Sequence, residues 1–108
     1  MKLNDLINEL ELSPFCVEDE APEVNGLYCG DLLSDVLAHL PDGAVWFTIQ
    51  GHVNIVAVAQ LRDAACIVLV NGVTPDPQTV AKARAMGVNI CGSDKTSADL
   101  CMALAGKF

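Results

Sequence analysis

The sequence predicts an α/β fold, a three-layer α/β/α sandwich with a mostly parallel sheet. Three observations support this class: strand-like apolar runs alternate with helix-like segments, residues 65–70 are apolar throughout, and the later helices carry clear start and stop signals. A continuous apolar run is typical of a parallel strand that is buried on both faces. Four strands that are each followed by a helix imply right-handed crossovers, with helices on both faces of the sheet.

The first half of the chain alternates helix and strand signals. Apolar residues within 6–10 predict a short helix that ends before residue 13, and a charged linker follows over about 18–23. We expect a strand over 26–29. Apolar residues that recur at helical spacing then predict a helix over 32–40, and a turn leads into a strand over 45–49.

The second half is more clearly punctuated. The predicted helix over 53–61 has small apolar residues on nearly every side, so we expect it to be buried. The strand over 65–70 follows it. The helix over 77–86 has proline at its first position, an aspartate cap before it and a glycine stop after it. We expect a strand over 88–91 and a last helix over 96–104, which begins with capping-box spacing.

Charge divides the chain into two parts. The 108 residues carry a formal charge of −8, and residues 1–24 hold seven of the 14 acidic residues but one of the six basic ones. We therefore expect an N-terminal helix with an acidic linker over 1–24, followed by the α/β domain over 25–108. Neither part has the basic stripe that binding to a phosphate backbone requires, which argues against nucleic acid as a partner.

Composition also bounds the compartment and the cofactors. No apolar run approaches the roughly 20 residues that span a bilayer, and the N-terminus lacks the features of a secretion signal. We expect a cytoplasmic protein that does not contact a membrane. The five cysteines include no C-x-x-C pair, so we expect free thiols and neither a metal nor a cofactor.

Polar side chains gather where the predicted strands end. The segment 46–59 is a strand-like run that breaks into polar residues around one glycine and resumes as a helix. In a parallel sheet such ends lie along one edge, where ligands and partners are met. Ordinary tight loops also use Gly, Asn and Asp, but the second loop holds bulkier polar groups than a turn needs. The candidate binding residues are Asp31, Thr48, Gln50, Gly51, His52, Asn54, Asn71 and Gly72.

His52 allows two interpretations. It could be a general acid or base that works with Asp31 or Asp94, or it could begin a helix and bond a nearby carbonyl. Gln50 and His52 could likewise bond only each other or the backbone and so stabilise the crossover. The chain has no phosphate-binding loop, nucleophile elbow or metal-ligand cluster, which favours a non-catalytic role.

Four segments, 30–36, 46–59, 68–76 and 83–90, together resemble a stand-alone DRTGG domain, and the match covers nearly all of the chain after about residue 24. The literal Asp-Arg-Thr-Gly-Gly is absent, and the Gly-Asp and Asn-Gly pairs at 30–31 and 71–72 stand in its place. The resemblance implies the α/β/α fold of the N-terminal domain of HPr kinase/phosphorylase. Such domains also occur fused to phosphotransacetylases and to regulatory pyrophosphatases with CBS domains.

The resemblance implies an accessory module rather than an active site. We expect a non-catalytic regulatory or binding domain, a homodimer that recognises a small ligand, with nucleotides among the candidates, or a partner protein. Single-domain relatives occur beside histidine-kinase-like and iron-hydrogenase components, which suggests a signalling or hydrogenase-associated partner. The alternative is a small enzyme that uses His52 with Asp31 or Asp94.

Overall fold

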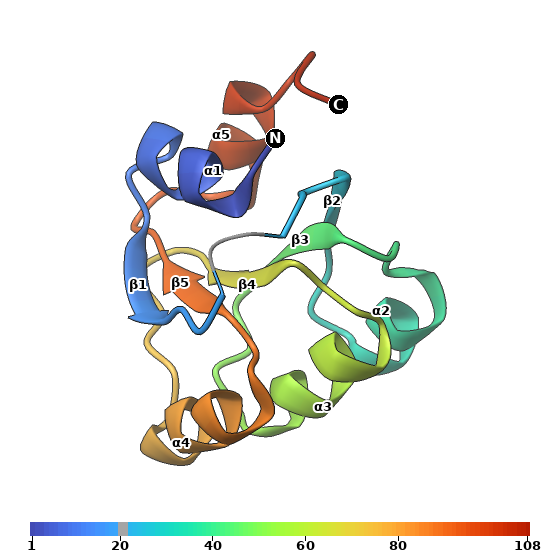
Figure 1. The fold of residues 1–108 in the computed structure, drawn as a ribbon, viewed down its shortest axis with the longest axis vertical. Helices are drawn as coiled ribbons and strands as arrows, with labels where there is room; N and C mark the ends of the chain where they lie inside the picture. The colour runs from blue at the N-terminus through green and yellow to red at the C-terminus, as the bar shows by residue number, and fades with distance from the viewer. Residues whose placement is uncertain (20–21) are drawn as a thin grey trace.

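The computed structural model describes residues 1–19 and 22–108, and in these residues five strands form one sheet between two layers of helices (Figure 1). The order across the sheet is β1-β5-β4-β3-β2. Strands β2 to β5 are parallel, and β1 pairs antiparallel with β5 at one edge. The predicted three-layer α/β/α fold with a mostly parallel sheet is confirmed. The strands are β1 (Ser13–Cys16), β2 (Gly26–Cys29), β3 (Ala44–Thr48), β4 (Cys66–Leu69) and β5 (Ile90–Gly92).

The helices are divided between the two faces of the sheet. Figure 1 shows α2, α3 and α4 on one face and α1 and α5 on the other. The parallel strands are neighbours in chain order, so each right-handed crossover returns over the same face. The order of these strands never reverses, so they form no topological switch point of the kind that creates a ligand crevice. The helices are α1 (Leu3–Glu9), α2 (Leu33–His39), α3 (Asn54–Leu61), α4 (Pro77–Met86) and α5 (Ser97–Ala103).

The core fills both sides of the sheet because successive side chains of a strand point to opposite faces. Val45 and Phe47 pack with the buried leucines of α1 and α5. Trp46 packs with Ile55 and the other buried side chains of α2, α3 and α4. Its indole Nε1 donates a hydrogen bond to the carbonyl of Gly30 at 2.9 Å, which satisfies the one polar atom of a fully buried ring. Trp46 is therefore a core residue.

Helix boundaries follow the local signals. Pro77 begins α4, and Gly87 ends it in the left-handed conformation with φ of 71°. Thr96 caps α5, since its Oγ1 accepts the N–H of Asp99 at 3.1 Å. Asp76 occupies the cap position of α4, but its side chain makes no capping hydrogen bond.

Helix α3 differs from its prediction. We expected burial nearly all round, but Ala57, Gln60 and Leu61 are exposed while Ile55 and Val56 are buried. The reason is the single-sided winding of the sheet, because α3 lies in an outer layer and can cover the sheet with one face only.

The N-terminal segment is integrated into the fold. Helix α1 buries Leu3 and Leu6 completely against the sheet. Strand β1, which the sequence did not predict, pairs with β5. Glu20, within the expected acidic linker, lies outside the described residues, and the division of the chain at residue 24 stays a prediction. None of the helices within 1–19 and 22–108 is long and apolar enough to cross a bilayer.

Candidate functional site

The C-terminal ends of β2, β3, β4 and β5 lie along one side of the sheet, which we call the strand-end edge. Parallel pairing in register produces this arrangement: Cys29 is opposite Phe47, Thr48 is opposite Leu69, and Leu69 is opposite Gly92. The predicted site residues all follow these strand ends or, like Thr48, close one of them.

Asp31 organises the first two strand ends. Its carboxylate Oδ1 accepts hydrogen bonds from Thr48 Oγ1 and from the N–H of Ile49, both at 2.9 Å. Its carbonyl oxygen accepts a hydrogen bond from Gln50 Nε2 at 3.0 Å. Thr48 is 1% exposed, and its Oγ1 also accepts the N–H of Gln50 at 3.2 Å. The structure thus brings Asp31, Thr48 and Gln50 together as a clamp between two adjacent loops.

Gly51 holds the next part of the chain in close contact with the segment before α4. Its carbonyl accepts the N–H of Asp76 at 3.0 Å and the hydroxyl of the buried Thr79 at 2.7 Å. A Cβ atom on Gly51 would lie 2.8 Å from the carbonyl oxygen of Thr74, so this close approach requires glycine. Thr79 was not among the predicted site residues, because a threonine in the first turn of a helix carries no sequence signal that points to this role.

His52 and Asn54 complete what we call the 51–54 turn. Both side chains are exposed, and neither has a hydrogen-bond partner among residues 1–19 and 22–108. In the same part of the chain, the backbone N–H groups of residues 52–54 have no acceptor, and no side chain caps α3. The bonds that we considered from His52 to Gln50, Asp31 or Asp94 are not formed between these described residues.

Asn71 and Gly72 belong to the other half of the strand-end edge. Both have positive φ, 59° and 73°. Their N–H groups donate to the carbonyls of Lys95 at 3.0 Å and Ser93 at 2.9 Å. The chain after β4 is therefore attached to the loop after β5, and it reaches the 51–54 turn through Thr74, Pro75 and the helix start of α4.

A groove of about 270 Å³ lies beside Gly72 and extends to β1. The groove was not predicted from the sequence, because part of its lining comes from β1 and from Leu10 and Glu11, between α1 and β1. Residues 48–54 do not line it. The lining residues are Leu10, Glu11, Ser13, Phe15, Gly72, Val73, Thr74, Gly92, Ser93, Asp94 and Lys95.

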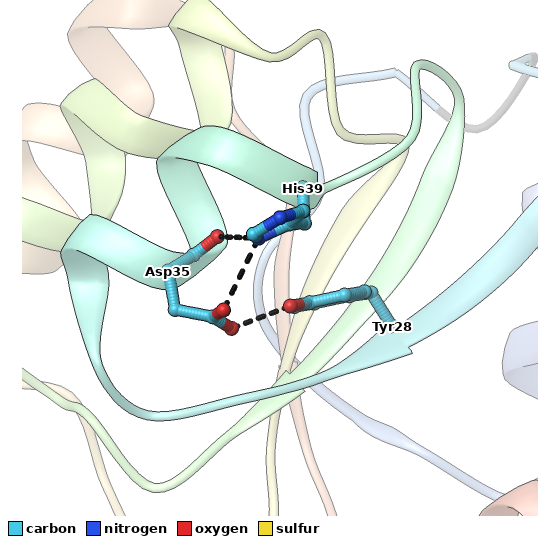
Figure 2. A network of polar contacts seen from close by, with 3 residues as sticks. All are labelled: Tyr28, Asp35 and His39. Carbon is cyan, nitrogen blue, oxygen red and sulfur yellow. Dashed lines mark hydrogen bonds and ion pairs between the residues drawn. The ribbon is translucent and has the colours of Figure 1, made fainter.

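A second polar cluster joins β2 to α2. Figure 2 shows Asp35 between Tyr28 and His39: its Oδ2 accepts the Tyr28 hydroxyl at 2.5 Å, and its Oδ1 lies 3.1 Å from His39 Nδ1. The hydrogen bond to the carboxylate raises the pKa of Tyr28, since ionisation would place two negative charges side by side. The sequence places His39 at a helix end with no polar side chain beside it and so predicts a surface residue without a partner; it is exposed, but Asp35 is a polar neighbour.

All five cysteines are free thiols in the part of the chain that the structure describes. Cys16, Cys66 and Cys91 are buried, and burial together with the neighbouring Glu18 raises the pKa of Cys16 to about 11. The described residues contain no group of three or more His, Cys, Asp or Glu side chains placed to hold a metal ion.

Comparison with known proteins places the fold. Neither a family model nor a curated protein sequence matches the chain. The structure is similar, with a TM-score of 0.76 over 95% of this chain, to a crystal structure of the CBS and DRTGG domains of the regulatory region of Clostridium perfringens pyrophosphatase. The fold is DRTGG-like. The DRTGG-like chain spans 45% of that solved chain at 9% sequence identity, so the similarity is one of fold.

Proposed function

We propose that this DRTGG-like chain is a non-catalytic regulatory module that binds a small nucleotide ligand at the strand-end edge, through the 51–54 turn. One observation carries the proposal: the turn presents two exposed polar side chains, His52 and Asn54, and backbone N–H groups that no described residue accepts. Free N–H groups at the start of a helix bind anionic groups well.

The residues on either side of His52 and Asn54 hold the turn in place. Gln50 is bonded to Asp31 on one side, and Gly51 is bonded to Asp76 and Thr79 on the other. A surface that is fixed before binding loses less conformational entropy when the ligand arrives. This rigidity supports a binding role for the two exposed side chains and a structural role for Gln50.

The ligand class is suggested by the structural neighbour. That crystal structure is of a regulatory region complexed with its activator, diadenosine tetraphosphate. One basic side chain, Lys95, stands at the strand-end edge after β5 and would attract the anionic groups of such a ligand.

The arrangement of Asp31 supports a binding role rather than acid–base catalysis. An enzyme that used His52 with Asp31 would need the carboxylate to orient the imidazole. Asp31 Oδ1 instead accepts hydrogen bonds from Thr48 and Ile49, which fixes it as part of the clamp.

We also propose a homodimer that forms along β2. The two edge strands of the sheet are β1 and β2. Strand β1 contains Pro14 and pairs with β5 in an irregular register, and both features hinder pairing with a further strand. The edge at β2 has neither feature. Leu32, between β2 and α2, is 69% exposed and would be covered by a second copy.

Isothermal titration with diadenosine tetraphosphate, ATP and AMP tests the binding proposal. We expect saturable binding of at least one of these nucleotides, and affinity at least about tenfold lower in His52→Ala and Asn54→Ala, a loss of about 1.4 kcal/mol. Asn4→Ala is the control, since it removes an exposed amide from α1 in the opposite layer. Absence of binding by all three nucleotides, or unchanged affinity in both variants, would refute the proposal.

Sedimentation velocity at micromolar concentration tests the dimer. We expect a dimer that dissociates in Leu32→Glu and persists in Met86→Glu, which places the same charge at the end of α4. A monomer in the unaltered protein, or equal dissociation in both variants, would contradict an interface at β2.

A further inference from the structure

Cys29 and Cys101 bring two thiols into contact at the surface. Cys29 ends β2 and Cys101 lies in α5, yet their Sγ atoms are 3.3 Å apart. Alternation along β2 places Cys29 on the same face as Leu27, which packs with the core beneath α1 and α5. A disulfide bond is about 2.05 Å long, so small side-chain rotations would bring the two sulfurs within bonding distance.

The other contacting thiols provide a comparison within the same molecule. Cys66 and Cys91 also share a side-chain hydrogen bond, which raises the pKa of Cys66, but they are 1% and 0% exposed. A solution oxidant cannot reach them in the folded protein. Cys29 is exposed and Cys101 is half-buried, so a solution oxidant can reach the pair at the surface.

The pair is in its reduced form in this structure. Desolvation, followed by the hydrogen bond with Cys101, raises the pKa of Cys29 to about 12. Cys29 is therefore a protonated thiol at neutral pH, and either sulfur can donate the hydrogen bond between the two. Disulfides that form in a reducing compartment are mostly transient and redox-responsive, and two neighbouring thiols can form a bond of that kind.

We propose that Cys29 and Cys101 form a reversible disulfide that ties α5 to β2 when a low-molecular-weight disulfide, such as oxidised glutathione, is present. The Cys101 thiolate attacks one sulfur of the small disulfide, so that a mixed disulfide forms and one small thiolate leaves. Cys29 then loses its proton to water, attacks the protein sulfur of the mixed disulfide and expels the second small thiolate. Two protein thiols are oxidised, and the small disulfide is reduced to two thiols.

The bond would close a loop that contains most of the chain, because the two cysteines are 72 residues apart. Closing a long loop lowers the entropy of the unfolded chain and stabilises the folded one. Cys29 is also two residues before Asp31, the centre of the clamp at the first strand ends. Oxidation would therefore fix the C-terminal helix and the start of the strand-end edge together.

The test is treatment of the full chain with oxidised glutathione, followed by alkylation, intact-mass measurement and peptide mapping. We expect a product lighter by two hydrogen atoms before alkylation, a single cross-linked peptide pair containing Cys29 and Cys101, and reversal by dithiothreitol. Cys29→Ser should instead accumulate one glutathione adduct on Cys101. Stable glutathione adducts on the unaltered protein, no reaction, or links to Cys66 or Cys91 would overturn the proposal.

Thermal unfolding supplies a second measurement that does not depend on the site at the 51–54 turn. The oxidised protein should melt at a higher temperature than the reduced protein, and Cys101→Ser should show no such difference between the two conditions. If the disulfide forms and the melting temperature is unchanged, α5 is not held by the bond as proposed.

Discussion

The two halves of the strand-end edge are held by different kinds of bond. At the ends of β2 and β3, side chains form the connections, with Asp31 and Gln50 linking one loop to the other. At the ends of β4 and β5, backbone N–H groups of Asn71 and Gly72 bond directly to backbone carbonyls. The first half therefore depends on which side chains are present, whereas the second depends on backbone conformations with positive φ.

The difference explains where a ligand can make specific contacts. Hydrogen bonds between backbone groups hold a loop without involving its side chains, but its backbone N–H groups are then no longer available to a ligand. In the first half, the clamp fixes the loop from one end and leaves the following side chains, His52 and Asn54, without described partners. A binding surface needs fixed geometry and available polar groups together, and the β3 end provides both.

Gly51→Ala should have the largest effect, because Gly51 is where the two halves meet. Its added Cβ would lie 2.8 Å from the backbone oxygen of Thr74, and overpacking against backbone costs up to about 3 kcal/mol. Urea unfolding measures this loss. Gly26→Ala is the control, since its Cβ would have no neighbour within 4 Å. Equal stability of the two variants would show that the close approach at Gly51 is unimportant.

Thr48→Val tests the clamp itself. The valine keeps the shape of the side chain but removes a hydroxyl that donates to Asp31 and accepts from Gln50. Leaving such groups without partners in a buried position should lower the free energy of unfolding by about 2 kcal/mol. Thr74→Val, at an exposed position on the same edge, should change stability much less. A similar loss in both variants would mean that the hydroxyl of Thr48 has no special role.

Gly72→Ala tests the half of the strand-end edge at the ends of β4 and β5, where backbone conformation matters more than side-chain contacts. An alanine with φ of 73° should cost about 1 kcal/mol, and the Asp94 side chain, 3.1 Å from the new Cβ, can rotate away. Gly87→Ala has nearly the same φ and no neighbour within 4 Å, so it should cost a similar amount. A far larger loss at Gly72 would indicate that the contact with Asp94 is rigid.

His52→Ala should have the smallest effect on stability. The ring is exposed and has no hydrogen-bond partner among the described residues, so the free energy of unfolding should change by less than about 0.5 kcal/mol. Chemical unfolding alongside nucleotide titration separates stability from binding. A loss of stability as large as that of Thr48→Val would place His52 in the clamp instead of the binding surface.

Local signals in the sequence were sufficient for much of the fold. Pro77 and Gly87 set the limits of α4, and the apolar run around β4 identified a parallel strand. Strand β1 could not be predicted in the same way, because Pro14 is unusual in a strand and its partner lies in β5. The ring of Phe15 occupies the space beside Gly92 that a Cβ would fill, a complementarity that exists only after folding.

The sequence predicted that the candidate residues lie at one edge of the sheet, but not which hydrogen bonds join them. A parallel sheet places its strand ends on one edge, so the proximity of Asp31 and Thr48 followed from the expected fold. The bond from Gln50 to the carbonyl of Asp31 depends on the register of β2 against β3, which alternating apolar residues do not define. The assignment of these residues to ligand binding stays a prediction.

The order of strands in the sheet has a consequence for the folding pathway. Strands β2 to β5 each pair with the next strand along the chain, so these contacts close short loops and can form early. The pairing of Ser13 with Gly92 spans most of the chain and must wait for β5. We therefore expect the first strand in the sequence to be the last to join the sheet. Until it does, the outer edge of β5 is an unprotected template for pairing with other chains.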